Sequence, residues 1–386
     1  MSLEKFIADL NGSAFWKEFT FAQNKFKPGP SEELELADSI VWLEAFALII
    51  QLKERTAPTG DPEAERAWFS NKVLKKAKKQ VRDTHHYLST HSEIAIVNER
   101  GERFVIRGKQ LQDIQSIIVY SAYDALPDDC WAIQYTESAQ AGFIHILDSG
   151  AYLDILRILR VPGDIREYFS YRKTVVPQLK ATGVRVQEAD IIGAYTHDEV
   201  IPTPTSHKHL HNLIQDLDSF ELTGLIGNIR NNIETSTNPT DYYRIMIEFG
   251  KLPRSVWHAL KGLLQYAVET VRAEDFALPV RAYYGKTDCV FMIMPLAPEL
   301  WGADGEAKVR RGNGLQGFTQ LAKYIHKARR GIGIQISRDG SDYLIDWALI
   351  DEPWEPEAEI EARLLKFNPF RDLKEKEVKS FHFREV

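Results

Sequence analysis

Two strand-like runs, separated by only two residues, constrain the fold of this chain more than any other feature. Residues 34–43 and 46–55 are rich in Ile, Val, Leu and aromatic side chains, as half-buried strands are. So short a connection predicts an antiparallel hairpin in which Leu43 pairs with Phe46. The register of this hairpin then decides which polar side chains face one another.

Three polar side chains gather on one face of the predicted hairpin. In the expected register Asp38 lies opposite Gln51, with about 5 Å between their Cβ atoms. Because side chains alternate along a strand, Lys53 points the same way as Gln51. One face therefore carries a carboxylate, an amide oxygen and an ammonium at the end of an otherwise apolar hairpin.

This combination suits metal-assisted hydrolysis of a phosphodiester. Mg²⁺ takes oxygen ligands and is usually held by one or two carboxylates together with substrate phosphate. Asp38 is the expected main ligand, with Gln51 adding a neutral oxygen and a backbone carbonyl near Leu52 completing the shell. Lys53 would orient or deprotonate the attacking water and offset charge in the transition state. Taken alone, the same pattern also fits a solvated strand end with a surface ion pair.

The helices predicted on either side of the hairpin help to decide between a metal site and a solvated strand end. Residues 2–26 are predicted to form a helix, because large apolar side chains recur there at helical spacing. A second helix, from about residue 63 to 88, follows the hairpin. The predicted order is helix, strand with Asp38, strand with Gln51 and Lys53, and helix.

In this order, and in the Asp-x12-Gln-x-Lys spacing, the chain resembles the PD-(D/E)XK, or restriction-endonuclease-like, nuclease superfamily. The resemblance lies in the N-terminal part, over residues 13–90 and at most to about 175. It is to the variant that has Gln, here Gln51, in place of the usual Glu. Members tend to carry an acid on the first helix, for which Glu18 is the candidate, and a Lys or Gln on the helix after the motif.

The resemblance implies a fold and a function. The fold is a mixed sheet flanked by helices, with Asp38, Gln51, Lys53 and Glu18 as catalytic residues and Asp38 and Gln51 as metal ligands. The cofactor is Mg²⁺ or Mn²⁺. The reaction is hydrolysis of nucleic acid, DNA more often than RNA, in restriction, repair or anti-phage defence.

The second helix adds support that does not depend on the resemblance. Between residues 72 and 82 it carries six cations and no acid. A solvated helix face normally mixes charges of both signs, so this one-signed stretch indicates a partner with negative charge, such as a phosphate backbone. A solvated Lys-rich helix remains the alternative. The predicted contacts to nucleic acid are Lys72, Lys75, Lys76, Lys79, Gln80 and Arg82.

The length of 386 residues is enough for two domains. Pro and Gly residues interrupt residues 177–206, which are predicted to link a nuclease domain, 1–176, to a C-terminal α+β domain, 207–386. The fold class is therefore α/β (α+β) overall. The C-terminal domain is expected to select substrate, form a homo-oligomer or bind a protein partner. Just after this linker, His207, His209 and His211 are expected to be solvated.

Composition excludes several classes of protein. A net charge of −7 argues against coating of nucleic acid through the whole surface, although it permits a local basic site. Two cysteines, Cys130 and Cys289, are too few for a Cys-based zinc cluster and fit a reducing cytoplasm. The apolar runs are too short to cross a bilayer, so no membrane association is expected.

Two further functions remain open from the sequence. With Gln51 a poorer ligand than Glu, the domain would bind nucleic acid or scaffold a defence or repair complex without cutting. Alternatively, the chain would be an interaction protein whose net charge serves protein partners alone.

Overall fold

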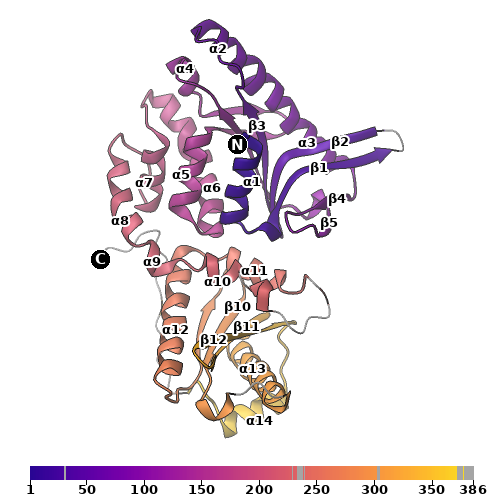
Figure 1. Ribbon diagram of the computed structural model, residues 1–386, viewed down its shortest axis with the longest axis vertical. Coiled ribbons are helices and arrows are strands. Elements are labelled where there is room, and N and C mark those ends of the chain that lie inside the picture. Colours follow the sequence, from indigo (N-terminus) through magenta and orange to yellow (C-terminus); the bar gives the residue numbers. More distant parts are fainter. Residues whose placement is uncertain are drawn as a thin grey trace. The chain divides into compact units, whose positions relative to one another are not determined.

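The computed structural model describes residues 1–29, 32–227, 229–232, 238, 240–301, 305–371 and 377. The protein is mixed α/β, with 48% helix and 25% strand and with mixed sheets. It divides into two compact units, the first spanning Met1–Gln215 and the second beginning at Asp216 (Figure 1). The predicted linker, residues 177–206, lies within the first unit, and much of it is helical.

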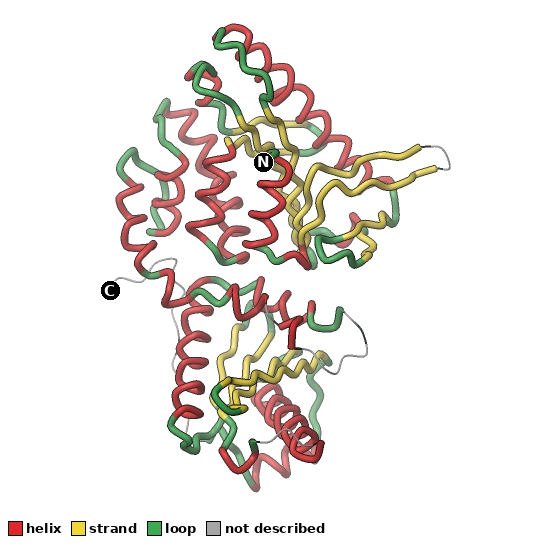
Figure 2. The backbone as a smooth tube through the Cα atoms, viewed as in Figure 1, coloured by secondary structure: helices red, strands yellow, loops and turns green. Residues whose placement is uncertain are grey.

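A six-stranded mixed sheet forms the centre of the first unit, in the order β1-β2-β3-β6-β8-β7 (Figure 2). β2 runs antiparallel to both of its neighbours, β1 and β3. β3, β6 and β8 run parallel, and β7 closes the edge antiparallel to β8. A separate hairpin consists of β4 and β5. The strands are β1 (Thr20–Gly29), β2 (Glu32–Leu43), β3 (Phe46–Glu54), β4 (Ile94–Val97), β5 (Arg103–Ile106), β6 (Asp113–Ser121), β7 (Tyr135–Ser138) and β8 (Gly142–Asp148).

Helices cover both faces of this sheet (Figure 1). On one face, Asn11 of α1 donates to Ser39 of β2 and accepts from the Tyr152 hydroxyl of α5. On the other face, apolar side chains of a long helical segment, Phe69 to Val81, pack on β6 and β8. The helices are α1 (Leu3–Ala14), α2 (Pro62–Trp68), η2 (Phe69–Ala77), α3 (Lys78–Thr90), α4 (Asp128–Trp131), α5 (Ser149–Leu159), α6 (Pro162–Thr182), α7 (Glu188–Thr196) and α8 (Leu210–Gln215).

The predicted hairpin register is confirmed. Leu43 pairs with Phe46, and the ladder continues in the same register to Ser39 opposite Ile50. Glu44 adopts a positive φ of 54°, which the tight connection requires.

The predicted first helix is correct only in part. α1 ends at Ala14, Trp16 has a φ of 61°, and residues 20–29 form β1. The large apolar side chains have helical spacing, but Phe21 and Phe26 pack in the cluster beneath β2 and α3. Pairing with β2 therefore outweighed local periodicity.

The second unit contains a four-stranded sheet in the order β12-β11-β10-β9, with β10 and β11 parallel. β11 carries Gly333, where a Cβ atom would lie 2.0 Å from Thr319 Oγ1 of α13, so α13 packs directly on the strand backbone. The elements are α9 (Leu217–Phe220), α10 (Thr223–Gly227), α11 (Tyr243–Gly250), α12 (Arg254–Arg272), β9 (Val280–Tyr284), β10 (Cys289–Pro295), α13 (Gly305–Ile325), β11 (Arg330–Asp339), β12 (Asp342–Asp351) and α14 (Ala358–Lys366).

Across the described ranges of both units, no helix is both long enough and apolar enough to pass through a bilayer.

Candidate active site

The structure brings Asp38 and Lys53 together at the end of the β2–β3 hairpin. Asp38 Oδ2 lies 3.6 Å from Lys53 Nζ and accepts a 2.6 Å hydrogen bond from the backbone N–H of Leu52. Both side chains are largely buried, with 13% of Asp38 and 11% of Lys53 exposed. This is a sheltered ion pair, and the solvated strand end that the sequence left open is not what the structure has.

The ammonium of Lys53 lies between two oxygens. Its Nζ donates to the Leu52 carbonyl at 2.6 Å while it faces Asp38, so two oxygens converge on one positive charge. Burial lowers the pKa of Lys53 from its usual value, and the positive charge of Lys76 lowers it further, against the opposing effect of Asp38. The ammonium is therefore easier to deprotonate than that of a solvated lysine.

A β-bulge in β2 adds a third polar residue to this end of the hairpin. Asn24 pairs with Ala37 and Lys25 with Glu35, so Leu36 is the extra residue. Burial raises the pKa of Glu35, and the negative charges of Asp38 and Glu4 raise it further. Glu35 therefore lies in the same electrostatic environment as Asp38, which strict alternation from the sequence did not reveal.

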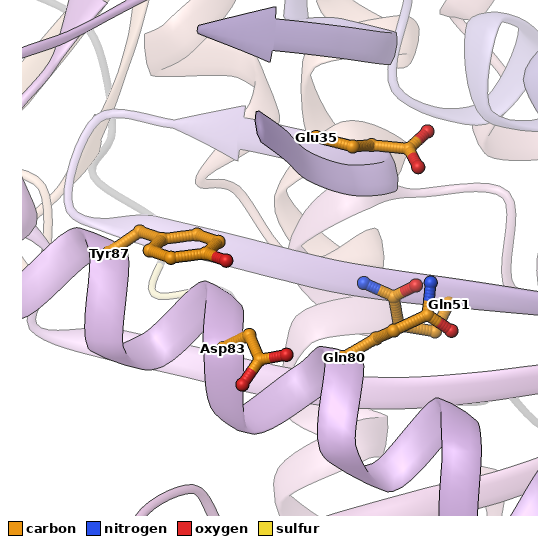
Figure 3. Close-up of a pocket in the computed structure, with 5 residues that line it drawn as sticks. All are labelled: Glu35, Gln51, Gln80, Asp83 and Tyr87. Atoms are coloured by element: carbon orange, nitrogen blue, oxygen red, sulfur yellow. The ribbon is translucent and has the colours of Figure 1, made fainter. Parts of the chain in front are cut away.

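Gln51 and Gln80 line one cavity of about 150 Å³, together with Glu35, Asp83 and Tyr87. Figure 3 shows Gln80, Asp83 and Tyr87 on α3 facing Gln51 on β3 and Glu35 on β2. Gln51 is 2% exposed, and the amide oxygens of both glutamines are buried without a hydrogen-bond partner among the residues that the structure describes. Because such oxygens are costly to leave unsatisfied, the cavity is suited to a group that both can bind.

The oxygens at this end of the sheet are of the type that hard divalent cations take as ligands. Asp38 supplies a carboxylate, Gln51 an amide oxygen and Leu52 a backbone carbonyl. Within the ranges that the structure describes, no group of three or more His, Cys, Asp or Glu side chains is placed to hold a metal. A cation here would accordingly have few protein ligands and keep several waters, as Mg²⁺ commonly does.

The six cations of residues 72–82 lie on η2 and α3. Their side chains divide between the two flanks of this helical segment. Lys78 donates to Thr136 of β7 at 3.4 Å, and Arg82, one turn later, shares that flank. Lys79 is exposed and pairs with Asp83 at 3.2 Å. Lys72, Lys75 and Lys76 are exposed and lie in η2, a π-helix, which is a rare form of helix. Of the predicted contacts, Arg82 thus faces away from the hairpin's polar end.

Glu18 is not part of this arrangement. It lies in η1 (Lys17–Phe19), is 1% exposed and pairs with Arg100 at 2.8 Å. Because Thr20 pairs with Val41, Glu18 lies toward the turn of the hairpin, away from Asp38. An acid of the first helix whose charge acts on this site is Glu4, which the sequence reasoning missed because the packing of α1 on the hairpin, as in the hydrogen bond from the Leu3 N–H to Glu54, joins residues distant in sequence.

Comparison of the chain with protein-family models, with curated proteins and with solved structures found no match.

Proposed function

We propose that the first unit is a metal-dependent nuclease that hydrolyses phosphodiester bonds of nucleic acid, DNA in preference to RNA. The observation that carries this proposal is the sheltered contact of Asp38 with Lys53, on the same hairpin as Gln51, whose buried amide oxygen has no hydrogen-bond partner among the described residues. A carboxylate, an amide oxygen and an amine are the groups that metal-assisted hydrolysis needs.

The order of elements is in keeping with this proposal. One helix, three strands that are antiparallel to their neighbours and a helical segment follow one another along the chain, and after the β4–β5 hairpin comes β6, which is parallel to β3. This mixed sheet flanked by helices supports the proposal. Because a fold can host unrelated functions, the weight of the proposal rests on the site.

Each residue at the site has a defined role. Asp38 and Gln51, with the Leu52 carbonyl, would hold Mg²⁺ or Mn²⁺. When bound there, the metal supplies Lewis-acid stabilisation of the phosphoryl oxygens and acidifies a water. Lys53 Nζ, with its lowered pKa, takes a proton from the attacking water or offers one to the leaving oxygen. The buried surroundings strengthen these interactions by excluding solvent.

The proposal is tested by incubating the full chain with supercoiled DNA, linear DNA and RNA, each with Mg²⁺, Mn²⁺ or EDTA. We expect cleavage that requires metal and is abolished in Asp38→Ala. Glu33→Ala is the matched control, since it removes an exposed carboxylate from the same strand. Metal-dependent cleavage that persists in Asp38→Ala would show that the hydrolysis occurs elsewhere.

The second candidate is nucleic-acid binding without cleavage. The hydrogen bond from Leu52 N–H to Asp38 and the presence of Gln51 instead of an acid both favour it. Binding without any cutting, under every metal tested, is the result that distinguishes this function from the first.

Charge reversal on the basic helix is expected to weaken binding to nucleic acid. Lys76→Glu combined with Lys79→Glu places negative charge beside the proposed path of the phosphates, so affinity for single-stranded DNA should fall at least tenfold in low salt. The slope of log affinity against log salt should fall by about 0.7 for each phosphate that the protein no longer neutralises. Lys308→Glu combined with Arg310→Glu, exposed on α13, is the control. Equal reductions in both pairs would indicate a general charge effect.

Gln51→Glu is expected to couple stability to metal. A carboxylate at this buried position near Asp38 and Glu35 suffers desolvation and repulsion, so the metal-free variant should unfold at a lower temperature than the wild type. Added Mg²⁺ should recover the difference, because a cation binds the additional charge more tightly. Thermal unfolding with and without Mg²⁺ measures both effects. A Gln51→Leu variant should show no recovery. If Mg²⁺ left the midpoint of Gln51→Glu unchanged, the metal site would be wrongly placed.

A further inference from the structure

A second, larger cavity of the first unit lies at the opposite edge of its sheet. This groove has a volume of about 720 Å³, within the range of small-molecule sites. Its walls come from α4 and the start of β7, from the end of α6, and from the segment that leads to α7. None of the residues proposed for hydrolysis lines it.

Two aromatic side chains supply a flat apolar surface in this groove. Trp131, at the end of α4, is 36% exposed, although its indole N–H is satisfied by the Leu126 carbonyl. The ring of Tyr135 is stacked on Phe143, with the centroids 4.9 Å apart and the planes 8° from parallel. One face of Tyr135 is thus covered and held flat by Phe143, and Lys180 Nζ lies over the ring, so a further planar group stacks on Tyr135 when Lys180 turns aside.

Two cations adjoin the aromatic surface. Lys180 Nζ lies 5.1 Å from the centroid of the Tyr135 ring, and Arg185 is exposed on the neighbouring segment. Neither side chain forms an ion pair with any residue in the described ranges. The cation–π contact is a weak restraint compared with an ion pair, so Lys180 can turn toward an anion.

A fixed imidazole completes the groove. Asp190 is 3% exposed and accepts hydrogen bonds from the backbone N–H of Gln187 and of His207. It also contacts His207 Nδ1 at 2.6 Å. A proton on Nδ1, donated to Asp190, leaves Nε2 as an acceptor for a donor on a ligand.

We infer that this groove binds a nucleotide, with the base on Trp131 and Tyr135 and the phosphate at Lys180 and Arg185. A nucleotide carries a planar base next to an anionic phosphate. The groove offers an aromatic surface next to two cations that form no ion pair within the described residues, so the two match. The same chemistry is presented by a free nucleotide and by one residue of a single strand. The inference does not rest on cleavage, because it concerns different residues.

The groove lies at the same level of the sheet as the candidate active site. Gln51 pairs with Ile118, Ile118 with Ile146, and the Ile146 N–H donates to the carbonyl of Gln134, which lines the groove. Three strand spacings, about 14 Å, separate the two backbones along the sheet. Tyr135 pairs with His145, which packs on Phe169 of α6, whereas Gln51 faces Gln80 of α3, so the groove and the candidate active site lie on opposite faces of the sheet.

The test measures binding of two probes to the full chain in EDTA, which prevents metal-dependent cleavage. The probes are AMP and a single-stranded oligonucleotide of four thymidines. Lys180→Ala with Arg185→Ala removes the two cations, and we expect affinity to fall at least tenfold. Lys173→Ala is the matched control, an exposed lysine of the same helix outside the groove, and should change affinity less than twofold.

Substitution of the aromatic ring provides the second readout. Tyr135→Leu should weaken binding about tenfold or more, whereas Tyr135→Phe, which retains the stacking surface, should stay within twofold of wild type. If Tyr135→Leu unfolds, as thermal unfolding would reveal, the exposed Lys180 and Arg185 variants still decide the question.

The possible results separate cleanly. Binding of AMP identifies a free nucleotide, and binding of the oligonucleotide alone identifies a strand; either supports the inference if the groove variants no longer bind. Absence of saturable binding to both probes overturns the inference. So does binding that survives the groove variants and disappears in Lys76→Glu/Lys79→Glu. Because the binding test contains no metal and its variants all lie outside the hairpin, a failure of the proposed hydrolysis leaves this result unaffected.

Discussion

Lys53→Arg is expected to lower the rate of metal-dependent cleavage by about 10²–10⁴-fold, the usual contribution of a positioned acid or base. Arginine keeps the positive charge near Asp38, but it does not release its proton in proteins. Lys53→Met, which removes the charge as well, should be at least as impaired. Single-turnover cleavage of saturating DNA measures both variants, and thermal unfolding checks that each remains folded.

The pH dependence of cleavage should identify the proton that Lys53 carries. Its pKa is lowered by burial and by Lys76, so the neutral amine forms at lower pH than in a solvated lysine. If the amine is the base, the rate rises with pH until this pKa is passed. Lys76→Met removes a positive charge that lowers the pKa, so the pKa should rise and the profile should move to higher pH. Lys72→Met, an exposed lysine in the same π-helical segment, is the control.

Two outcomes would contradict this role. Lys53→Arg with nearly wild-type cleavage would show that the residue acts only through its charge. A profile that Lys76→Met shifts to lower pH, or leaves in place, would mean that another group controls the rate.

Arg172→Met is expected to destabilise the first unit by about 3–5 kcal/mol, the cost of breaking a buried ion pair by removing one partner. The Arg172 side chain is fully buried on α6. It forms a bidentate pair with Glu188 of α7, at 2.7 and 3.0 Å, and donates to the carbonyls of Gln134 and Ile146. Its removal would leave the Glu188 carboxylate, 9% exposed, and two carbonyls without this donor.

Thermal or denaturant unfolding of the full chain measures the effect, with an expected fall of roughly 6–20 °C in the transition of the first unit. Arg166→Met is the matched control. Arg166 lies on the same helix and pairs with Asp113 at 2.6 Å, but 46% of its side chain is exposed. Its pair should contribute about 1 kcal/mol or less. Destabilisation of similar size in the two variants would show that the buried network of Arg172 is not what stabilises this part of the fold.

Local patterns accounted for part of the fold. The two-residue connection defined the hairpin register, because only one pairing accommodates so short a turn. The stripe of Phe69, Val73, Ala77 and Val81 correctly predicted a helix buried against the sheet. The first helix failed because Phe21 and Phe26 are equally consistent with a strand on a core, and pairing with β2 depends on residues distant in sequence.

The residues of the candidate site were likewise predicted only in part from local patterns. Alternation along one hairpin was enough to associate Asp38 with Lys53, whereas only the packing of α3 placed Gln80 in one cavity with Gln51. Glu18 failed because the chain leaves the helix before that residue. Glu4 and Glu35 could not be predicted as part of the site. The packing of the first turn of α1 decides where the Glu4 side chain lies, and the β-bulge in β2 decides where that of Glu35 lies.

The sequence by itself determined the hairpin, its register and the polar trio at its end, because these follow from the short turn and from the alternation of side chains. Only the tertiary structure decided that Asp38 and Lys53 are sheltered, that the pKa of Lys53 is lowered, and that a groove opens three strands away. Burial and electrostatic environment depend on α3, α6 and the parallel strands, which contact the hairpin or one another across long stretches of sequence. No local pattern encodes those distances.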